Sequence, residues 1–195
     1  MREFVVLGHD APTTDDFSLS DLPGAGRMDL LCRCLTSALL LSHDIRADVT
    51  AHLVLDDTFT VAFDSDSLRH FNPDERSTAA RVRDALAQRE EAVGRMPVET
   101  SPGVSLRRGG LEATLSAVDG PLYQLHGEGT SAVAVEPPAN LVFVLSDHRE
   151  FGEKEATLLS EVREERLSLG PAALHADQAI TVAHNWLDTD GFSSY

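Results

Sequence analysis

The sequence predicts an α/β fold with a mainly parallel sheet flanked by helices. Segments with strand patterns alternate along the chain with segments of helical periodicity, which is typical of βαβ units with parallel strands. The apolar run at residues 140–145, Asn-Leu-Val-Phe-Val-Leu, is the strongest signal of a buried strand. Hydrophobic residues make up 42% of the 195 residues, which is enough for a core that needs no metal or disulfide. We find no repeat and no domain boundary, and we expect a single domain over residues 1–195.

The chain is expected to begin with a strand, a long loop and a helix. Residues 3–7 form a short apolar run that is typical of a buried strand. Residues 8–24 are rich in Asp, Ser, Pro and Gly, which supply the chemistry of turns and helix caps. Apolar side chains then recur at helical spacing over residues 27–42, which predicts a helix with one buried face.

A hairpin and a second helix are expected next. Residues 49–55 and 59–63 read as strands on either side of an Asp56-Asp57 turn. Pro73, followed by two acidic residues, marks the start of a helix that is expected to continue to about Val93.

The second half of the chain alternates shorter segments after breaks at Pro97, Pro102 and Gly103. In chain order we expect a helix near residues 110–118, short strands at 122–125 and 132–135, the buried strand at 140–145, a helix at 153–162, a short strand at 166–169 and a closing helix at 176–187.

The charge of the chain allows two interpretations. The sequence has 32 acidic and 16 basic residues, a formal net charge of -16, and a single lysine, Lys154. Such a balance argues against a nucleic-acid partner, because phosphate contacts need cations. It also suits a protein adapted to molar salt, in which self-repulsion is screened. In that case the arginines are the residues to consider for phosphate and base contacts.

The cysteines and the chain start indicate a reduced, cytoplasmic protein. Cys32 and Cys34 lie two residues apart in an expected helix, roughly 200° around its axis from one another, so they cannot readily form a disulfide. The chain start resembles no signal peptide, and the longest apolar stretch, residues 35–41, is too short to span a bilayer.

Two clusters of residues could carry chemistry in the first and middle parts of the chain. Pro23-Gly-Ala-Gly-Arg-Met-Asp29 places two glycines before a helix, where free N–H groups attract anions. Alone, this pattern favours an ordinary loop, because it lacks the further residues of dinucleotide and phosphate-binding loops. Residues 145–148, Leu-Ser-Asp-His, end the strongest strand; a ligand site and a simple turn are equally consistent with them.

A third cluster lies near the end of the chain. Gly170-Pro171 follows an expected strand and fixes a sharp turn whose main chain suits a flat heterocycle. His175 and His184 are nine residues apart with no convincing third ligand, so we expect no metal site. A nucleophilic serine is excluded as well, because the chain has no Gly-x-Ser-x-Gly motif.

Segments along nearly the whole chain, in order, resemble one family. They are Arg2-Glu-Phe-Val-Val-Leu-Gly-His-Asp-Ala-Pro-Thr13, Phe17-Ser-Leu-x-Asp-Leu-Pro-Gly-Ala-Gly-Arg27, Asp29-Leu-Leu-Cys-Arg-Cys-Leu35, Phe143-Val-Leu-Ser-Asp-His148, Ser168-Leu-Gly-Pro171, Leu174-His-Ala-Asp-Gln178 and His184-Asn-x-Leu-Asp188. Together they resemble the TrmY family, the archaeal tRNA pseudouridine N1-methyltransferases of the SPOUT superfamily.

The resemblance implies a fold, a reaction and a partner. The fold is a parallel sheet flanked by helices, with a C-terminal trefoil knot that holds S-adenosylmethionine. The reaction is methylation of N1 of pseudouridine 54 in the tRNA T-loop, by a homodimer. We place the subunit interface on the apolar faces of the helices at residues 27–42 and 176–187.

The resemblance also assigns residues to the cofactor pocket. They are Leu125, Ser146, Leu169, Gly170, Pro171, Ala172, Ala173, Leu174 and Ala179. Two positions depart from the family pattern, because many relatives carry glycine in place of Ser146 and cysteine in place of Ala179. A serine can still present its backbone, and an alanine keeps the pocket small and apolar.

On the RNA side, Arg27 and Asp29 are the expected catalytic residues. Arg27 would bind a phosphate or a uracil carbonyl, and its place at a helix start suggests a nearby anion, since helix N-termini disfavour cations. Asp29 would orient the base or accept its proton, although a first-turn acid is equally explained by the helix dipole. We expect Arg27, Arg33 and Arg46 to contact RNA. The alternatives are a related knotted ribosomal RNA methyltransferase and a non-catalytic RNA- or nucleotide-binding module.

Overall fold

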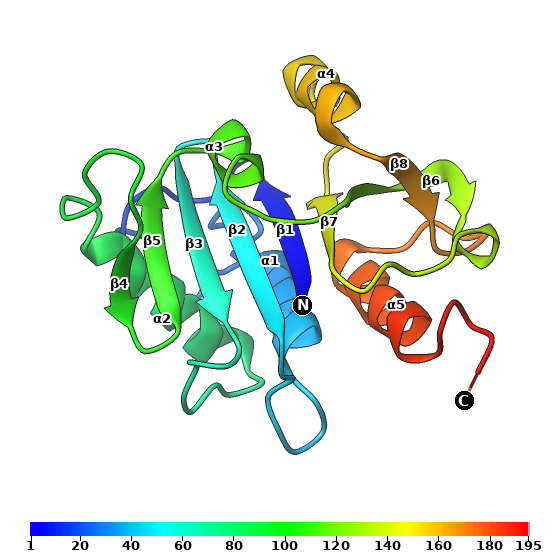
Figure 1. Ribbon diagram of the computed structural model, residues 1–195. Coiled ribbons are helices and arrows are strands. Elements are labelled where there is room, and N and C mark those ends of the chain that lie inside the picture. The colour runs from blue at the N-terminus through cyan, green and yellow to red at the C-terminus, as the bar shows by residue number, and fades with distance from the viewer. Residues whose placement is uncertain (195) are drawn as a thin grey trace.

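The computed structural model describes residues 1–194, and in this part of the chain eight strands form one sheet with helices on both faces (Figure 1). The strands are β1 (Arg2–Gly8), β2 (Val49–Leu55), β3 (Phe59–Asp64), β4 (Val98–Ser101), β5 (Val104–Arg108), β6 (Leu122–Ser131), β7 (Leu141–Ser146) and β8 (Glu165–Ser168). The helices are α1 (Met28–Leu39), α2 (Glu75–Ala87), α3 (Leu111–Leu115), α4 (Glu153–Val162), α5 (Ala176–Asp188) and a short 3₁₀ helix, η1 (Ala132–Ala134).

The strand order is β4-β5-β3-β2-β1-β7-β6-β8, and its central part is parallel. β1 pairs in parallel with β2 and with β7, so that Phe4 lies between Ala51 and Phe143. β6 and β8 continue the parallel part to one edge of the sheet. The predicted α/β fold with a mainly parallel sheet is confirmed. Because these strands run in one direction, their carboxyl ends meet along one side of the sheet.

The other edge of the sheet is antiparallel. The predicted hairpin of β2 and β3 is confirmed, whereas β4 and β5 were not predicted. β3, β5 and β4 pair antiparallel, and β4 and β5 form a hairpin around Pro102-Gly103. Gly103 has φ +74, and a Cβ there would lie 2.4 Å from the amide nitrogen of Leu68, so this turn requires glycine. The residues that read as chain breaks are therefore the turn between two short strands.

Several predicted elements differ from the structure. β6 continues to Ser131 instead of ending at residue 125, and α3 ends at Leu115, before residue 118. α1 ends at Leu39 because Leu40 is extended (ψ 143) and bridges to Ile45. α2 ends at Ala87, well before Val93. The segment at residues 132–135, expected as a strand, forms the 3₁₀ helix η1, because the long strand β6 ends directly before it.

Helices on the two faces bury different sets of side chains. α1, α2 and α5 cover one face, where the larger core contains Phe4, Phe143 and Trp186. α3 and α4 cover part of the other face over a smaller cluster that includes Val5 and Val144. Successive side chains of a strand point to opposite faces, which explains why neighbours in β1 and β7 enter different cores.

Both cysteines lie in the core of this sheet-and-helix sandwich. Cys32 and Cys34 are buried and free, and burial raises the pKa of Cys32 to about 12. A thiol with so high a pKa is a poor nucleophile. Among the helices of residues 1–194, none combines the length and the hydropathy that a membrane span needs.

Candidate functional site

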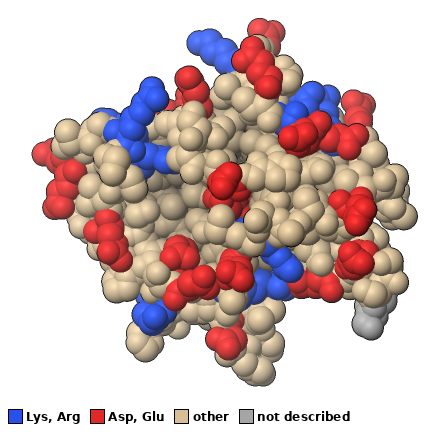
Figure 2. All heavy atoms as spheres, in the orientation of Figure 1, with Lys and Arg blue, Asp and Glu red and all other residues tan. Residues whose placement is uncertain are grey.

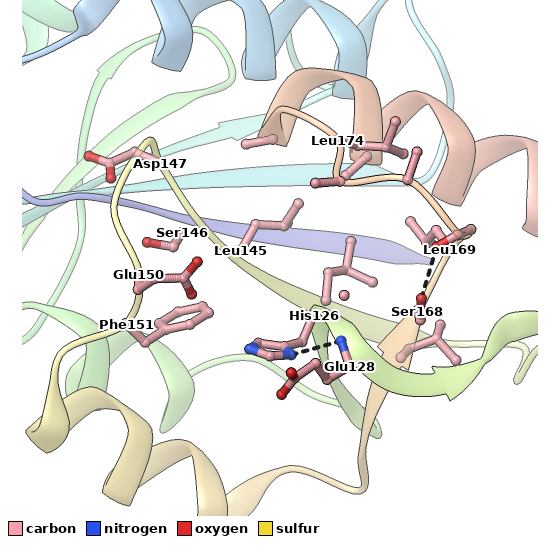
Figure 3. A pocket seen from close by; sticks show the side chains of 18 of the residues that line it. His126, Glu128, Leu145, Ser146, Asp147, Glu150, Phe151, Ser168, Leu169 and Leu174 are labelled. Carbon is pink, nitrogen blue, oxygen red and sulfur yellow. Dashed lines mark hydrogen bonds between the residues drawn. The ribbon is translucent and has the colours of Figure 1, made fainter.

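A cavity of about 550 Å³ lies at the carboxyl ends of β7 and β8, beside the middle of β6, where its pairing with β8 is interrupted, and beside the start of α5 (Figure 3). Its size falls within the range of small-molecule sites. In open α/β sheets the carboxyl ends of parallel strands are the usual place for a ligand, because the following loops diverge there. The fold thus gives this cavity its position, and the loops after β7 and β8 give it its walls.

The walls of the cavity combine apolar side chains with carboxylates. Leu125, Leu145 and Leu169 contribute apolar surface from the strand ends. Glu128 reaches the cavity from β6 and Glu150 from the loop after β7, both on the side that faces Leu174 across the opening in Figure 3. Such a lining suits a ligand with a flat apolar part and with hydroxyl or cationic groups.

The segment between β8 and α5 folds back along the cavity. The hydroxyl of Ser168 donates to the carbonyl of Gly170 at 3.1 Å, which turns the chain as the strand ends. The backbone N–H of His175 donates to the Gln178 side chain at 3.1 Å, and the amide of Ala179 donates to the His175 carbonyl at 2.9 Å. His175 is therefore the N-cap residue of α5.

The cavity brings together eight of the nine residues assigned to the cofactor pocket. They are Leu125, Ser146, Leu169, Gly170, Ala172, Ala173, Leu174 and Ala179. Pro171 is exposed in the same loop but is not among the lining residues. The hydroxyl of Ser146 donates to the Arg149 carbonyl, so this side chain is already engaged in the β7–α4 loop.

His9 joins the ends of two neighbouring strands and the start of α4. Its backbone N–H and ring Nδ1 each lie 2.9 Å from a carboxylate oxygen of Asp147, and its Nε2 lies 3.1 Å from Glu155 Oε2. The Asp147 side chain is 0% exposed, and it also accepts the amide N–H of Arg149 at 2.9 Å. His9 thereby ties β1 to the loop 146–152, part of which lines the cavity.

The protonation of this cluster follows from its contacts. Burial disfavours a charged His9, but the hydrogen bonds and charges of Asp147 and Glu155 outweigh it and raise the pKa of His9. Burial likewise disfavours the Asp147 carboxylate, yet the N–H groups of Arg149 and His9 lower its pKa. The histidine and the two carboxylates form a charge-assisted network.

The position of His9 in the sequence indicates a place at the same end of the sheet as Asp147. His9 directly follows β1, and Asp147 directly follows β7. Because β1 and β7 are parallel neighbours, the residues after them lie side by side. Asp147 was singled out as a strand-end residue, but its partner could be named only once the strand order was known.

Arg27, Asp29 and Arg33 form an ion-pair cluster at the start of α1. Arg27 has φ 60 and holds Asp29 in a fork, with Nε at 2.9 Å and Nη2 at 3.0 Å from the two carboxylate oxygens. Arg33 Nη1 lies 3.1 Å from Asp29 and 3.0 Å from Glu75. The anion expected near Arg27 is therefore Asp29. The hydrogen bond from Arg27, followed by that from Arg33, lowers the pKa of Asp29 despite its burial.

The structure places Arg46 away from this cluster. Arg46 precedes β2, at the amino ends of the parallel strands, and its Nη1 lies 3.0 Å from Asp188 at the end of α5. Asp188 also pairs with Arg2 at 2.6 Å. Of the three arginines expected to contact RNA, Arg27 and Arg33 lie together, whereas Arg46 lies at the opposite end of the parallel strands.

His184 is part of the core and does not reach the cavity. It is 1% exposed, its Nε2 lies 3.0 Å from the Ala38 carbonyl, and its Nδ1 lies 3.1 Å from Arg2. Burial, then the charges of Arg46 and Arg2, lower its pKa to about 4. Within residues 1–194 no three His, Cys, Asp or Glu side chains are placed to hold a metal ion together.

Known proteins resemble this chain along its full length. Residues 1–192 match the model of a family described as SAM-dependent RNA methyltransferases. Proteins named tRNA (pseudouridine(54)-N(1))-methyltransferase from Haloarcula marismortui and Haloferax volcanii are 61% and 60% identical to it over 100% of both chains. The protein of that name from Methanococcoides burtonii is 42% identical over 96% of both chains.

A solved structure resembles the fold. Archaeoglobus fulgidus Nep1 bound to S-adenosylhomocysteine has a TM-score of 0.62 to this chain at 13% sequence identity, covering 94% of this chain and 95% of that one. So low an identity supports the architecture alone. The match over residues 1–192, together with relatives at 42–61% identity, shows that this chain belongs to the family of SAM-dependent RNA methyltransferases.

Proposed function

We propose that this protein transfers a methyl group from S-adenosylmethionine to N1 of pseudouridine 54 in the tRNA T-loop, giving N1-methylpseudouridine. The names of the relatives support the substrate and the position. The observation that carries the proposal is the cavity at the ends of β7 and β8 and the middle of β6, which gathers eight of the nine residues expected around the methyl donor.

The residues of the cavity fit this donor. Leu125, Leu145 and Leu167 offer apolar surface for the adenine ring. The carboxylates of Glu128 and Glu150 suit ribose hydroxyls and the positive charge near the sulfur. Ser146 would act through its backbone, because its hydroxyl is bound to Arg149, and the small Ala179 leaves the space open.

The chain's own contribution to the reaction is positioning. When bound, S-adenosylmethionine supplies an electrophilic methyl group on a sulfonium sulfur. Pseudouridine is joined to its sugar through carbon, so its N1 carries a proton that leaves as the N1–methyl bond forms. The target base has to swing out of the T-loop stack, and the site has to hold N1 within attacking distance of the methyl group.

Asp29 and Arg27 are best suited to orient the base as a unit. A general base works best with a pKa near the working pH. The pKa of Asp29 is shifted the other way, because Arg27 and Arg33 donate to its carboxylate. We therefore assign Asp29 the role of holding Arg27, whose remaining N–H groups would face a uracil carbonyl or a phosphate. We assign the N1 proton to water.

We further propose that the chain folds as one domain over residues 1–195, with the C-terminal part threaded into a trefoil knot, and acts as a cytoplasmic homodimer. The segment from β8 to α5 lines the cavity, which is where the knot would hold the donor. The subunit interface cannot use the apolar faces of α1 and α5 as first expected. Those faces, with Leu35 and Ile180, are buried in the core of the same chain.

Two assays separate this function from its rivals. Calorimetry with S-adenosylmethionine tests the donor, and transfer of labelled methyl groups to tRNA or to ribosomal RNA tests the acceptor. We expect binding and selective methylation of tRNA. Selective methylation of ribosomal RNA would favour the related knotted enzyme, and RNA binding without methyl transfer would favour a non-catalytic module.

A further inference from the structure

Arg163 and Arg166 meet on the side-chain oxygen of a buried glutamine. Arg163 Nη1 lies 3.0 Å and Arg166 Nε lies 3.3 Å from Gln124 Oε1. Gln124 is 1% exposed, so its amide oxygen is a fixed anchor, while both arginines are only partly buried. One oxygen thus holds two guanidinium groups side by side at the surface.

Neither guanidinium is neutralised by a carboxylate of residues 1–194. The contrast with Arg27, Arg33 and Arg46 is direct, because each of those three binds an aspartate. Other arginines of residues 1–194 also lack a carboxylate partner, but these two are held together on one buried oxygen. Their donors are available to an external anion.

The neighbouring glutamates are directed elsewhere. Glu165 accepts a hydrogen bond from the hydroxyl of Thr130, and alternation along β8 places it on the other face from Arg166. Burial and the charges of Glu164 and Glu165 raise the pKa of Tyr123, so both carboxylates lie within electrostatic reach of that hydroxyl. The acidic residues next to the two arginines in sequence therefore do not form ion pairs with them.

The two arginines lie on the other face of the sheet from the cavity, at its edge strand β8. Gln124 and Arg166 are paired in β6 and β8, and the next residue of each strand, Leu125 and Leu167, lines the cavity. Figure 2 shows acidic side chains spread over the visible face and basic ones in small separate groups, one of them at the upper right near α4 and β8. Because β8 is the edge strand, a large ligand such as a folded RNA at the cavity can extend around the edge and place a phosphate on the pair.

We propose that Arg163 and Arg166 form a binding site for the backbone phosphates of the RNA substrate, with Gln124 as its anchor. The site rests on the proposed function, since it presumes an RNA acceptor at the cavity. A guanidinium presents its donors in a planar fork that matches phosphate oxygens. Two such groups held together repel one another, and a bound phosphate relieves that repulsion.

The test compares two double variants of equal charge. Arg163→Gln with Arg166→Gln removes the proposed site, and Arg76→Gln with Arg95→Gln removes two exposed arginines near the opposite edge of the sheet. Each is measured for tRNA affinity across a potassium chloride series, for KM and kcat, and for S-adenosylmethionine affinity. Arg163→Lys with Arg166→Lys keeps both charges. This lysine variant replaces the glutamine variant in the comparison if the glutamine variant does not fold.

We expect the first variant to raise the KM for tRNA about tenfold or more, with kcat and cofactor affinity unchanged. Its plot of log affinity against log salt should be shallower by roughly 1.5, since each phosphate contact contributes about 0.7–0.9 to the slope. The lysine variant should keep the wild-type slope. A glutamine variant that behaves like the Arg76 and Arg95 control, or a lysine variant that loses the slope, overturns the site. If the wild type binds tRNA without methylating it, the proposed function fails, while the slopes still decide the role of the two arginines.

Discussion

Asp29 accepts hydrogen bonds from both Arg27 and Arg33 at the start of α1. This geometry favours an orienting role for Asp29 over a proton-accepting one. Asp29 is 7% exposed, and its two carboxylate oxygens accept hydrogen bonds from Nε and Nη2 of Arg27. The residues form one structural unit. The functional effect of changing one should depend on whether the other is present.

We expect Asp29→Asn and Arg27→Gln each to lower kcat/KM roughly 10- to 100-fold, in line with the loss of one charged hydrogen bond. The kcat/KM of the double variant should be no lower than that of the less active single variant, because either change alone already breaks the hydrogen bonds between Arg27 and Asp29. The measurement is a double-mutant cycle with labelled methyl transfer. Additive losses, or a loss for Asp29→Asn alone, would assign Asp29 an independent role.

His9 predicts a pH dependence of stability. Its pKa is raised in the folded protein, so its charged contacts with Asp147 and Glu155 stabilise the fold fully below its ordinary pKa. That stabilisation is lost as the pH rises through the raised value. His9→Gln should lower the free energy of unfolding by roughly 1–2 kcal/mol at pH 6 and by progressively less towards pH 9.

Urea unfolding of wild type and variant at constant potassium chloride checks this dependence, with His43→Gln on an exposed loop as the control. A difference in unfolding free energy that stays constant from pH 6 to pH 9 would show that His9 contributes by packing and not by charge.

At the scale of elements, the segment between β8 and α5 forms one wall of the cavity. Gly170 lies in this segment, its φ lies outside the left-handed range, and a Cβ built there meets nothing within 4 Å. A side chain at this position is therefore compatible with the backbone but enters the space beside the cavity.

Gly170→Leu should leave the melting temperature within a few degrees of the wild type and weaken S-adenosylmethionine binding by about tenfold or more. Gly170→Ala, which adds a single carbon, is the matched control and should bind nearly normally. Calorimetric titration of both folded variants checks this. Wild-type affinity in Gly170→Leu would remove the segment from the binding site.

Elements with long periodic or apolar patterns could be predicted from the sequence. β1, β7, α4 and α5 lie within one or two residues of their expected bounds. β4 and β5 could not be predicted, because strands of four and five residues around a Pro-Gly turn carry too little alternation. In the site, the turn at Gly170 could be predicted from the sequence. The contact between His9 and Asp147 could not, because it depends on the order of the strands in the sheet, which local sequence patterns do not encode.

Charge pairing was the least predictable part of the site. The sequence does not show which arginines are paired with carboxylates. In the structure an aspartate pairs with each of Arg27, Arg33 and Arg46. Arg163 and Arg166 follow a helix in a stretch rich in glutamate and show no favourable pattern. Only the folded chain separates neutralised arginines from available ones, because the partners come from distant segments.

At the scale of the whole molecule, the net charge of -16 predicts a requirement for salt. Screening relieves repulsion within the acidic surface and between that surface and RNA. Folding and methylation should therefore both improve as potassium chloride rises towards molar concentrations. Circular dichroism and methylation rates over one salt series check this. Activity that is highest at low salt and declines while the fold stays intact would contradict it, and would count against an RNA substrate.

The central claim is methyl transfer to N1 of pseudouridine 54, and a pair of tRNAs differing at that base tests it most directly. Both tRNAs are incubated with the protein and labelled S-adenosylmethionine in high salt, and mass spectrometry of nuclease fragments locates the methyl group. We predict one methyl group on the T-loop fragment of the tRNA with pseudouridine at position 54 and none on the tRNA with uridine there, because uridine N1 is bonded to the sugar. Equal methylation of both tRNAs, or a methyl group located outside the T-loop, would contradict the account.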